Sequence, residues 1–152
     1  MNILVFGFKG NISEEILAEL NTGMAKYVLA SNEAEIKAFI ERVKFNDFDY
    51  VLGMGVYSGA DASKIRIETT FTSQFHNDKK GNHSVTVTPF LHESTHFKIA
   101  KRAGNSYCNL VSYLFTSKYP KIPYCFLHIP KSYPLTRAIG VINAELEGLE
   151  YL

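Results

Sequence analysis

Cys108 is the residue whose surroundings are best suited to covalent chemistry. The segment Ala103-Gly104-Asn105-Ser106 turns the chain into a helix predicted to begin near Tyr107, so Cys108 falls in the first turn. The free N–H groups and the helix dipole favour negative charge there, which is a setting that lowers the pKa of a thiol. The same N–H groups could stabilise the oxyanion of a tetrahedral intermediate. Cys108 is therefore a candidate nucleophile.

A cysteine nucleophile needs a base, and His128 and Glu68 are candidates for the base and its partner. His128 ends the strand predicted after the Cys108 helix. A neighbouring parallel strand end would bring its imidazole near the sulfur. Glu68, near the end of another predicted strand, could bind the second ring nitrogen and fix the tautomer. Free cysteine is among the most buried residue types, so the residues alone also fit a structural role.

Strand and helix patterns that alternate along the chain must position these residues. Strands are predicted over 3–8, 26–30, 50–56, 64–72, 84–88, 97–101 and 123–129. Helices are predicted to open at 11–15 with Ser13 as the cap, at Asn32 with a capping box to Glu35, at Tyr107, and over 135–149. The polar segment 74–82 is predicted to be a loop. The pattern favours one α/β domain over 1–152, a three-layer sandwich with a mainly parallel sheet covered by helices on both faces.

Composition narrows the class of function. The chain has 152 residues, with 16 basic and 15 acidic side chains, so it has no broad field to attract nucleic acid or anionic lipid. No segment approaches the roughly 20 apolar residues of a membrane span. The first strand lacks the basic flank and cleavage site of a signal peptide. The two cysteines, Cys108 and Cys125, form no disulfide framework. A cytoplasmic protein without nucleic-acid or membrane partners is expected.

Three segments resemble pyroglutamyl peptidase I, the pyrrolidone-carboxylate peptidase family of cysteine peptidases. The first is Ala103-Gly104-Asn105-Ser106-Tyr107-Cys108-Asn109, which is similar to the family's nucleophile motif. The second is Phe126-Leu127-His128-Ile129-Pro130, similar to its base motif. The third is the glycine-bearing strand over 50–59 followed by Ile67-Glu68. Gly7-Phe8 also resembles the family's Gly-Phe pair, at a corresponding position near the start of the chain. The order and approximate spacing agree over most of the chain.

The resemblance implies a family fold and a division of roles. Cys108 would be the nucleophile, His128 the base and Glu68 the residue that orients the imidazole. The reaction would remove an N-terminal pyroglutamyl residue, or hydrolyse a similar small amide, through an acyl-enzyme and without a cofactor. Phe8 and Tyr107 would help line an apolar pocket for the acyl group. The resemblance also implies a small peptide or amide substrate and assembly as a homo-oligomer.

The sequence departs from the family pattern in the expected pocket. Lys9-Gly10-Asn11 follows Phe8 where a second pocket aromatic is expected, and Val56 stands in place of a glutamine. An arginine expected about ten residues after the glutamate is replaced by Asp78 and Lys79. Retention of the trio beside a changed pocket leaves two alternatives open. One is a divergent enzyme with another substrate, and the other is a non-catalytic relative that binds a small ligand or a protein.

A second motif points to different chemistry. His92-Glu93-Ser94-Thr95-His96 spells H-E-x-x-H, which binds zinc when it lies on a helix, with the two histidines as ligands and the glutamate as base. Serine and threonine are poor helix formers, and the residues that follow read as a strand. No third ligand stands at a recognisable spacing. A polar loop leading into a strand is the favoured interpretation, and no metal site is expected.

Overall fold

The computed structural model describes residues 1–61, 63–75, 83–101 and 103–151 of the chain. The strands are β1 (Ile3–Phe8), β2 (Ala25–Leu29), β3 (Tyr50–Tyr57), β4 (Ile65–Glu68), β5 (Thr70–Thr72), β6 (Ser84–Thr86), β7 (Phe97–Ala100) and β8 (Tyr124–Pro130). The α-helices are α1 (Ile12–Glu19), α2 (Glu33–Arg42), α3 (Tyr107–Lys118) and α4 (Leu135–Gly148). Most of the segment predicted as a loop over 74–82, including Asp78 and Lys79, lies outside the described residues.

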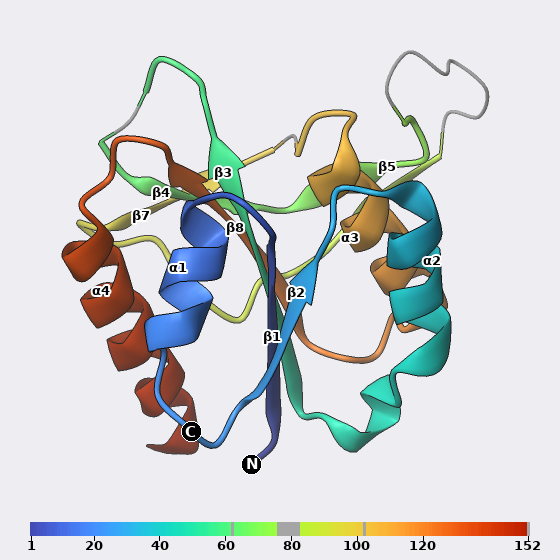
Figure 1. The fold of residues 1–152 in the computed structure, drawn as a ribbon, viewed down its shortest axis with the longest axis horizontal. Helices are drawn as coiled ribbons and strands as arrows, with labels where there is room; N and C mark the ends of the chain where they lie inside the picture. Colours follow the sequence, from blue (N-terminus) through green and yellow to red (C-terminus); the bar gives the residue numbers. More distant parts are fainter. Residues whose placement is uncertain (62, 76–82, 102, 152) are drawn as a thin grey trace.

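The main sheet has six strands in the order β2-β1-β3-β8-β4-β7. Strands β2, β1, β3 and β8 are parallel to one another, β4 is antiparallel to β8, and β7 is parallel to β4. Helices α1 and α4 pack against one face of the sheet, and α2 and α3 pack against the other (Figure 1). This arrangement confirms the predicted three-layer α/β fold with a mainly parallel sheet. No helix in the described part of the chain is long and apolar enough to cross a membrane.

Strand β1 illustrates why the sequence folds into layers. All six of its residues are buried. Ile3 and Val5 belong to the core under α1 and α4, whereas Leu4, Phe6 and Phe8 belong to the core under α2 and α3. Side chains alternate between the faces of a strand, so an uninterrupted apolar run fits a strand that is covered on both sides.

The first helix is capped by Asn11 and not by Ser13 as predicted. The Asn11 side chain accepts a hydrogen bond from the Ser13 backbone N–H at 2.9 Å. The Ser13 hydroxyl is buried and accepts a hydrogen bond from the Phe8 backbone N–H at 2.8 Å, which ties the helix to the end of β1. Gly7 allows this approach, because a Cβ there would lie 2.9 Å from the Ser13 carbonyl oxygen. At the second helix, the predicted Asn32 cap is confirmed by a 3.1 Å bond from the Glu35 N–H.

The strand predicted over 64–72 is wrong as a single element, because the chain leaves the main sheet at Thr69. The Thr69 N–H donates to the Ala100 carbonyl at 3.1 Å, and the Thr69 carbonyl accepts from Val87 at 2.9 Å. The residues beyond it pair with β6 in a separate two-stranded sheet. Alternation of side chains continues across this break, so the sequence pattern does not reveal it. As a consequence, Glu68 is the last residue of β4.

Candidate active site

The structure places Cys108 where the sequence predicts it, as the second residue of α3. Its half-buried side chain lies over Gly55 of β3, because a Cβ built on Gly55 would overlap the Cys108 Sγ. Ser106 occupies the N-cap of the helix, but its side chain makes no capping hydrogen bond. The thiol therefore stands beside the first amides of the helix and above the carboxyl-terminal half of a central strand.

His128 and Glu68 are joined by a buried hydrogen bond. The His128 Nδ1 lies 2.8 Å from the Glu68 Oε1, and the Glu68 side chain is only 1% exposed. The antiparallel register pairs Arg66 with His128 and Glu68 with Phe126, which puts the carboxylate diagonally across from the imidazole on the same face. The sequence-based pairing of these two residues thus has a geometric basis in the ladder between β4 and β8.

The route by which His128 approaches the thiol differs from the prediction. The strand that precedes the Cys108 helix, β7, is not next to β8, because β4 lies between them. The parallel neighbour of β8 is β3, and its Gly55 pairs with His128. The space above Gly55 is bordered by the Cys108 Sγ, and the His128 Cδ2 would lie 3.5 Å from a Cβ placed there. Since Nδ1 faces Glu68, the Cδ2–Nε2 edge of the ring is the one on the side of the thiol.

Because Gly55 is a glycine, adding a methyl group there tests the placement of the thiol beside His128. In Gly55→Ala, the new methyl group would overlap the Cys108 Sγ, so we expect the Cys108 side chain to rotate away. Displacing the thiol from the imidazole should lower any Cys108-dependent hydrolysis by about 100-fold or more. The melting temperature should change little, because a single terminal atom moves. Gly53→Ala is the control, since its methyl group would meet the buried Phe6 and Phe126 rings and should cost stability instead.

Burial controls the ionisation of the candidate nucleophile. Loss of hydration raises the pKa of Cys108 to about 12, and the negative charge of Glu68 adds to this rise, whereas the residue's own backbone N–H opposes it. The predicted lowering of the thiol pKa is therefore wrong, because burial outweighs the helix terminus. The resting side chain is a neutral thiol, and a nucleophile would form only as its proton moves to a base.

Arg66 and Tyr57 complete the cluster, and neither was predicted from the sequence. The Arg66 Nε lies 3.3 Å from the Glu68 Oε1, and its guanidinium stacks 4.3 Å above the centre of the Tyr57 ring. Both donors to Glu68 converge on one oxygen, while Oε2 is buried without a hydrogen-bond partner among the described residues. The spacing of Arg66 and Glu68, two residues apart on a strand, is the signal that could have found Arg66.

Asn109, next to the candidate nucleophile, holds the start of α3 in place. Its side chain is fully buried and accepts from the Thr72 N–H at 2.8 Å. Its amide nitrogen donates to the carbonyl oxygens of Thr72 at 2.9 Å and of Gln74 at 2.8 Å. With a longer contact to the Thr72 hydroxyl at 3.4 Å, these bonds fix the helix against the end of β5, so Asn109 positions the turn that carries Cys108. Its place in the sequence motif gave no indication of this structural role.

The two predicted pocket residues lie in different environments. Phe8 is 2% exposed and belongs to the core beneath α2 and α3, with its ring centre 6.4 Å from that of Phe6. Tyr107 is half-buried at the first position of α3, and its ring centre lies 5.4 Å from that of Phe75. A role for either residue in binding an acyl group stays a prediction.

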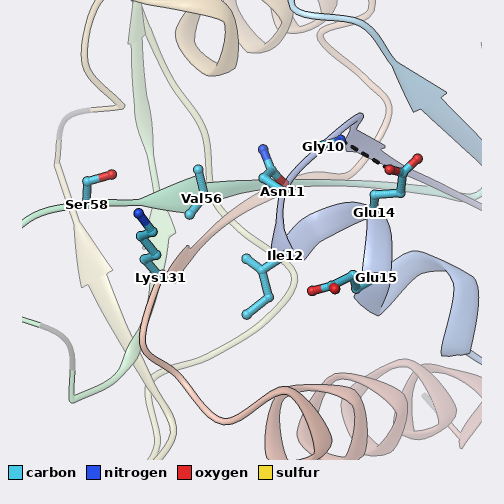
Figure 2. A pocket seen from close by; sticks show the side chains of 8 residues that line it. All are labelled: Gly10, Asn11, Ile12, Glu14, Glu15, Val56, Ser58 and Lys131. Atoms are coloured by element: carbon cyan, nitrogen blue, oxygen red, sulfur yellow. Dashed lines mark hydrogen bonds between the residues drawn. The ribbon is translucent and has the colours of Figure 1, made fainter.

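Two cavities border the carboxyl edge of the sheet. The cavity drawn in Figure 2 has a volume of about 630 Å³ and includes Ile12 of α1, Val56 of β3 and Lys131. It opens on the face of α1, opposite to the face that carries Cys108, because Val56 alternates with Gly55 along β3. A second cavity, of about 470 Å³, is lined by Thr70, Thr72, Gln74, Lys101, Ala103, Gly104 and Asn105. This second cavity adjoins the turn that leads to Cys108, so we consider it the more relevant one for chemistry at the thiol.

The H-E-x-x-H segment does not form the helix that a zinc site of this type needs. Residues 92–96 form an irregular stretch before β7, and His92 is exposed. The Glu93 carboxylate accepts a hydrogen bond from the Ile99 N–H at 3.0 Å. Within the described ranges, no group of three metal-ligating side chains comes together. The favoured interpretation, a polar loop leading into a strand, is confirmed.

Cys125 lies in the core, where burial raises its pKa to about 12 from the ordinary value of 9.0. Above pH 9 the unfolded chain releases the thiol protons of Cys108 and Cys125, whereas the folded chain retains them. The free energy of unfolding should therefore fall as the pH rises. The slope for each thiol rises through pH 9 toward a limit of about 1.4 kcal/mol per pH unit. Urea unfolding between pH 8 and pH 10 measures it. The buried Tyr124 hydroxyl adds to the slope near pH 10, so the slope in Cys125→Ala should be smaller but not zero, and an equal slope in this variant would contradict the assignment.

Comparison with known proteins adds to this geometry. No protein family model matches the chain, and no curated protein matches it by sequence. Several solved structures match by shape. The pyrrolidone carboxyl peptidase from Thermococcus litoralis superimposes with a TM-score of 0.76 at 16% identity, over 99% of this chain and 94% of that one.

Two further solved structures show the same similarity. The pyrrolidone carboxyl peptidase from Thermus thermophilus gives a TM-score of 0.74 at 19% identity, over 95% of this chain and 98% of that one. The pyroglutamyl peptidase I from Bacillus amyloliquefaciens gives 0.69 at 16% identity, over 96% and 91%. The similarity covers nearly the whole chain in each case. The protein therefore has the fold of the pyrrolidone carboxyl peptidases.

Proposed function

We propose that this protein is a cysteine-type peptidase or amidase that hydrolyses an N-terminal pyroglutamyl residue or a similar small amide. The observation that carries the proposal is one buried arrangement. The Glu68 carboxylate holds the His128 Nδ1 at 2.8 Å, and the Cys108 thiol stands over Gly55 on the other side of the ring. A nucleophile, a base and a residue that orients the base are the parts that covalent hydrolysis of an amide needs.

In the proposed reaction, His128 Nε2 takes the thiol proton while the Cys108 sulfur attacks the carbonyl carbon of the substrate. Glu68 keeps the ring oriented and stabilises the imidazolium that forms. The oxyanion of the tetrahedral intermediate is stabilised by backbone N–H groups of the first turn of α3, among them that of Cys108. When the intermediate collapses, the carbon–nitrogen bond breaks and the imidazolium gives its proton to the leaving amine. Water activated by His128 then hydrolyses the thioester and restores the thiol.

The high thiol pKa fits concerted proton transfer better than a preformed ion pair. Burial and the Glu68 charge keep Cys108 neutral in the resting protein. The same carboxylate orients the imidazole that receives the proton, and the proton moves most readily when negative charge passes from sulfur to the oxyanion. Premature oxidation or alkylation of the sulfur is disfavoured, because both reactions require the thiolate.

The acyl group is inferred from the shared fold. Solved structures of this shape are described as pyrrolidone carboxyl peptidases and pyroglutamyl peptidase I, which supports a small lactam as the first substrate to examine. Val56, which stands where the family resemblance implies a glutamine, faces the α1 side of the sheet and not Cys108, but Lys9-Gly10-Asn11 stand where the resemblance implies a second pocket aromatic. For this reason acetyl and prolyl amides belong in the same screen as pyroglutamyl amides.

Trapping the covalent intermediate tests the proposal directly. The protein is mixed with a pyroglutamyl anilide, quenched in acid within one turnover, and analysed by intact mass and peptide mapping. The expected result is a pyroglutamyl thioester on Cys108, together with release of the aniline. Release of the aniline without an adduct on Cys108, or an adduct on Cys125, would contradict the mechanism.

A non-catalytic relative that binds a small ligand is the second candidate, and the burial of Cys108 favours it. A thiol with a pKa of about 12 is a poor nucleophile unless a base acts on it. If no amide in the screen is hydrolysed and none forms an adduct, this candidate replaces the first.

A further inference from the structure

Arg66 and Tyr57 form a stacked pair beside the candidate base. The guanidinium of Arg66 lies 4.3 Å from the centre of the Tyr57 ring, and that ring centre lies 6.3 Å from the centre of the His128 ring. Arg66 comes from β4 and Tyr57 from β3, so the pair reaches across the intervening strand β8. We call this pair the Arg66–Tyr57 wall.

The strand register locates the wall relative to the thiol. Gly55, which underlies Cys108, pairs with His128, and Tyr57 pairs with Pro130 two residues further along β8. Arg66 pairs with His128 from the opposite strand. The wall therefore stands between the thiol–imidazole pair and the carboxyl edge of the sheet, where substrates of open α/β sheets enter. A leaving group attached to a carbonyl at Cys108 would pass next to it.

The Arg66 guanidinium is held in one orientation but has N–H groups available to a ligand. Its Nε donates to the Glu68 Oε1 at 3.3 Å, and stacking on Tyr57 sets the plane of the group. Among the described residues, neither of its terminal nitrogens donates a hydrogen bond. The side chain is 19% exposed, so a ligand can reach it. A planar, partly desolvated guanidinium with unused N–H groups is well suited to a carboxylate.

We propose that Arg66 determines specificity by binding a carboxylate on the leaving group. This inference rests on the proposed function. His128 must protonate the leaving nitrogen, so that nitrogen lies next to the imidazole, and an α-carboxylate only two bonds away lies within reach of Arg66. The substrate class is therefore an amino acid with a free α-carboxylate whose nitrogen carries a pyroglutamyl or similar small acyl group. Longer peptides and neutral amides lack the carboxylate at this position.

A pair of matched substrates tests the inference. Pyroglutamyl-alanine and its C-terminal carboxamide differ only in the charge that Arg66 would bind. The wild-type protein should show a KM for the free acid that is about tenfold to a hundredfold below that for the amide. Arg66→Gln should abolish this ratio, and Arg66→Lys should retain part of it. Arg42→Gln, which changes an exposed arginine at the end of α2, should leave the ratio unchanged.

The ratio separates specificity from effects on the base. Arg66→Gln also removes a bond to Glu68, which lowers kcat for both substrates alike, whereas only loss of carboxylate binding changes the ratio of the two KM values. Cys108-dependent turnover with equal KM values for acid and amide would overturn the inference while the proposed function stands.

A binding measurement tests the inference if the protein shows no turnover. Calorimetry measures the binding of the same two compounds to the Cys108→Ala protein. If no turnover occurs but the acid still binds more tightly than the amide through Arg66, the proposed function fails and carboxylate recognition remains. Equal binding of the two compounds overturns the inference in this assay as well.

Discussion

Replacing Cys108 with alanine should lower kcat/KM for a pyroglutamyl anilide by roughly 10⁴-fold or more, which is the loss expected when a nucleophile is removed from a catalytic triad. The change removes only the sulfur, which lies over Gly55 in a space bordered by the imidazole. The fold should persist, because the Asn109 side chain, and not the thiol, holds α3 in place through its bonds to Thr72 and Gln74. Initial rates and thermal melting of the same preparation measure both effects.

Cys125→Ala is the matched control for this variant. Its sulfur is completely buried in the core on the other face of the sheet, so its removal should reduce stability and leave kcat/KM near the wild-type value. Equal activity of the wild-type and Cys108→Ala proteins would exclude Cys108 as the nucleophile. Loss of activity in both cysteine variants to the same extent would point to unfolding and not to chemistry.

Glu68→Gln should change hydrolysis and thiol reactivity in opposite directions. The glutamine oxygen can still accept from the His128 Nδ1, but the negative charge that stabilises the imidazolium is lost, so kcat/KM should fall by about 10³- to 10⁴-fold. The same charge contributes to the high pKa of Cys108. Its removal should lower that pKa, although burial, the larger cause, keeps it above 9.0. Alkylation of Cys108 by iodoacetamide at pH 8.5 should therefore become faster.

A fall in kcat/KM together with a rise in the alkylation rate distinguishes this effect from a general loss of structure. A variant that merely loosened the fold would also expose Cys125, so peptide mapping should show that alkylation rises at Cys108 alone. Glu93→Gln serves as the control, because Glu93 lies in the loop before β7 and bonds to the backbone of Ile99. Slower alkylation in Glu68→Gln would contradict the assigned effect of the Glu68 charge on the thiol.

The elements that the sequence predicts well are those with continuous or helical apolar patterns. The parallel strands β1, β3 and β8 and the helix α3 lie within a few residues of their predicted positions, since burial on both faces leaves an unmistakable run of apolar residues. The placement of Cys108 at a helix start followed from the glycine-containing turn before it. Local patterns carry this information because each element is specified by its own residues.

Other features depend on partners that are distant in the sequence, and these features were not predicted. The antiparallel direction of β4 and the break at Thr69 arise from pairing with β8 and from bonds to Ala100. The Cys108 pKa follows burial by surrounding elements, which a helix-terminus argument does not include. The Arg66–Tyr57 wall joins two strands separated by a third. Each of these properties is set by tertiary contacts.

The position of β8 has a consequence for how the protein is made. It is the last strand in the sequence, yet it is inserted in the interior of the sheet between β3 and β4. During synthesis, a chain that has not yet emerged past residue 123 would hold two unjoined half-sheets, each with an open edge that invites aggregation. His128 lies on β8, the strand that joins the two half-sheets. If the proposed mechanism holds, the thiol has no base until β8 joins the sheet, and a truncated nascent chain would be inactive.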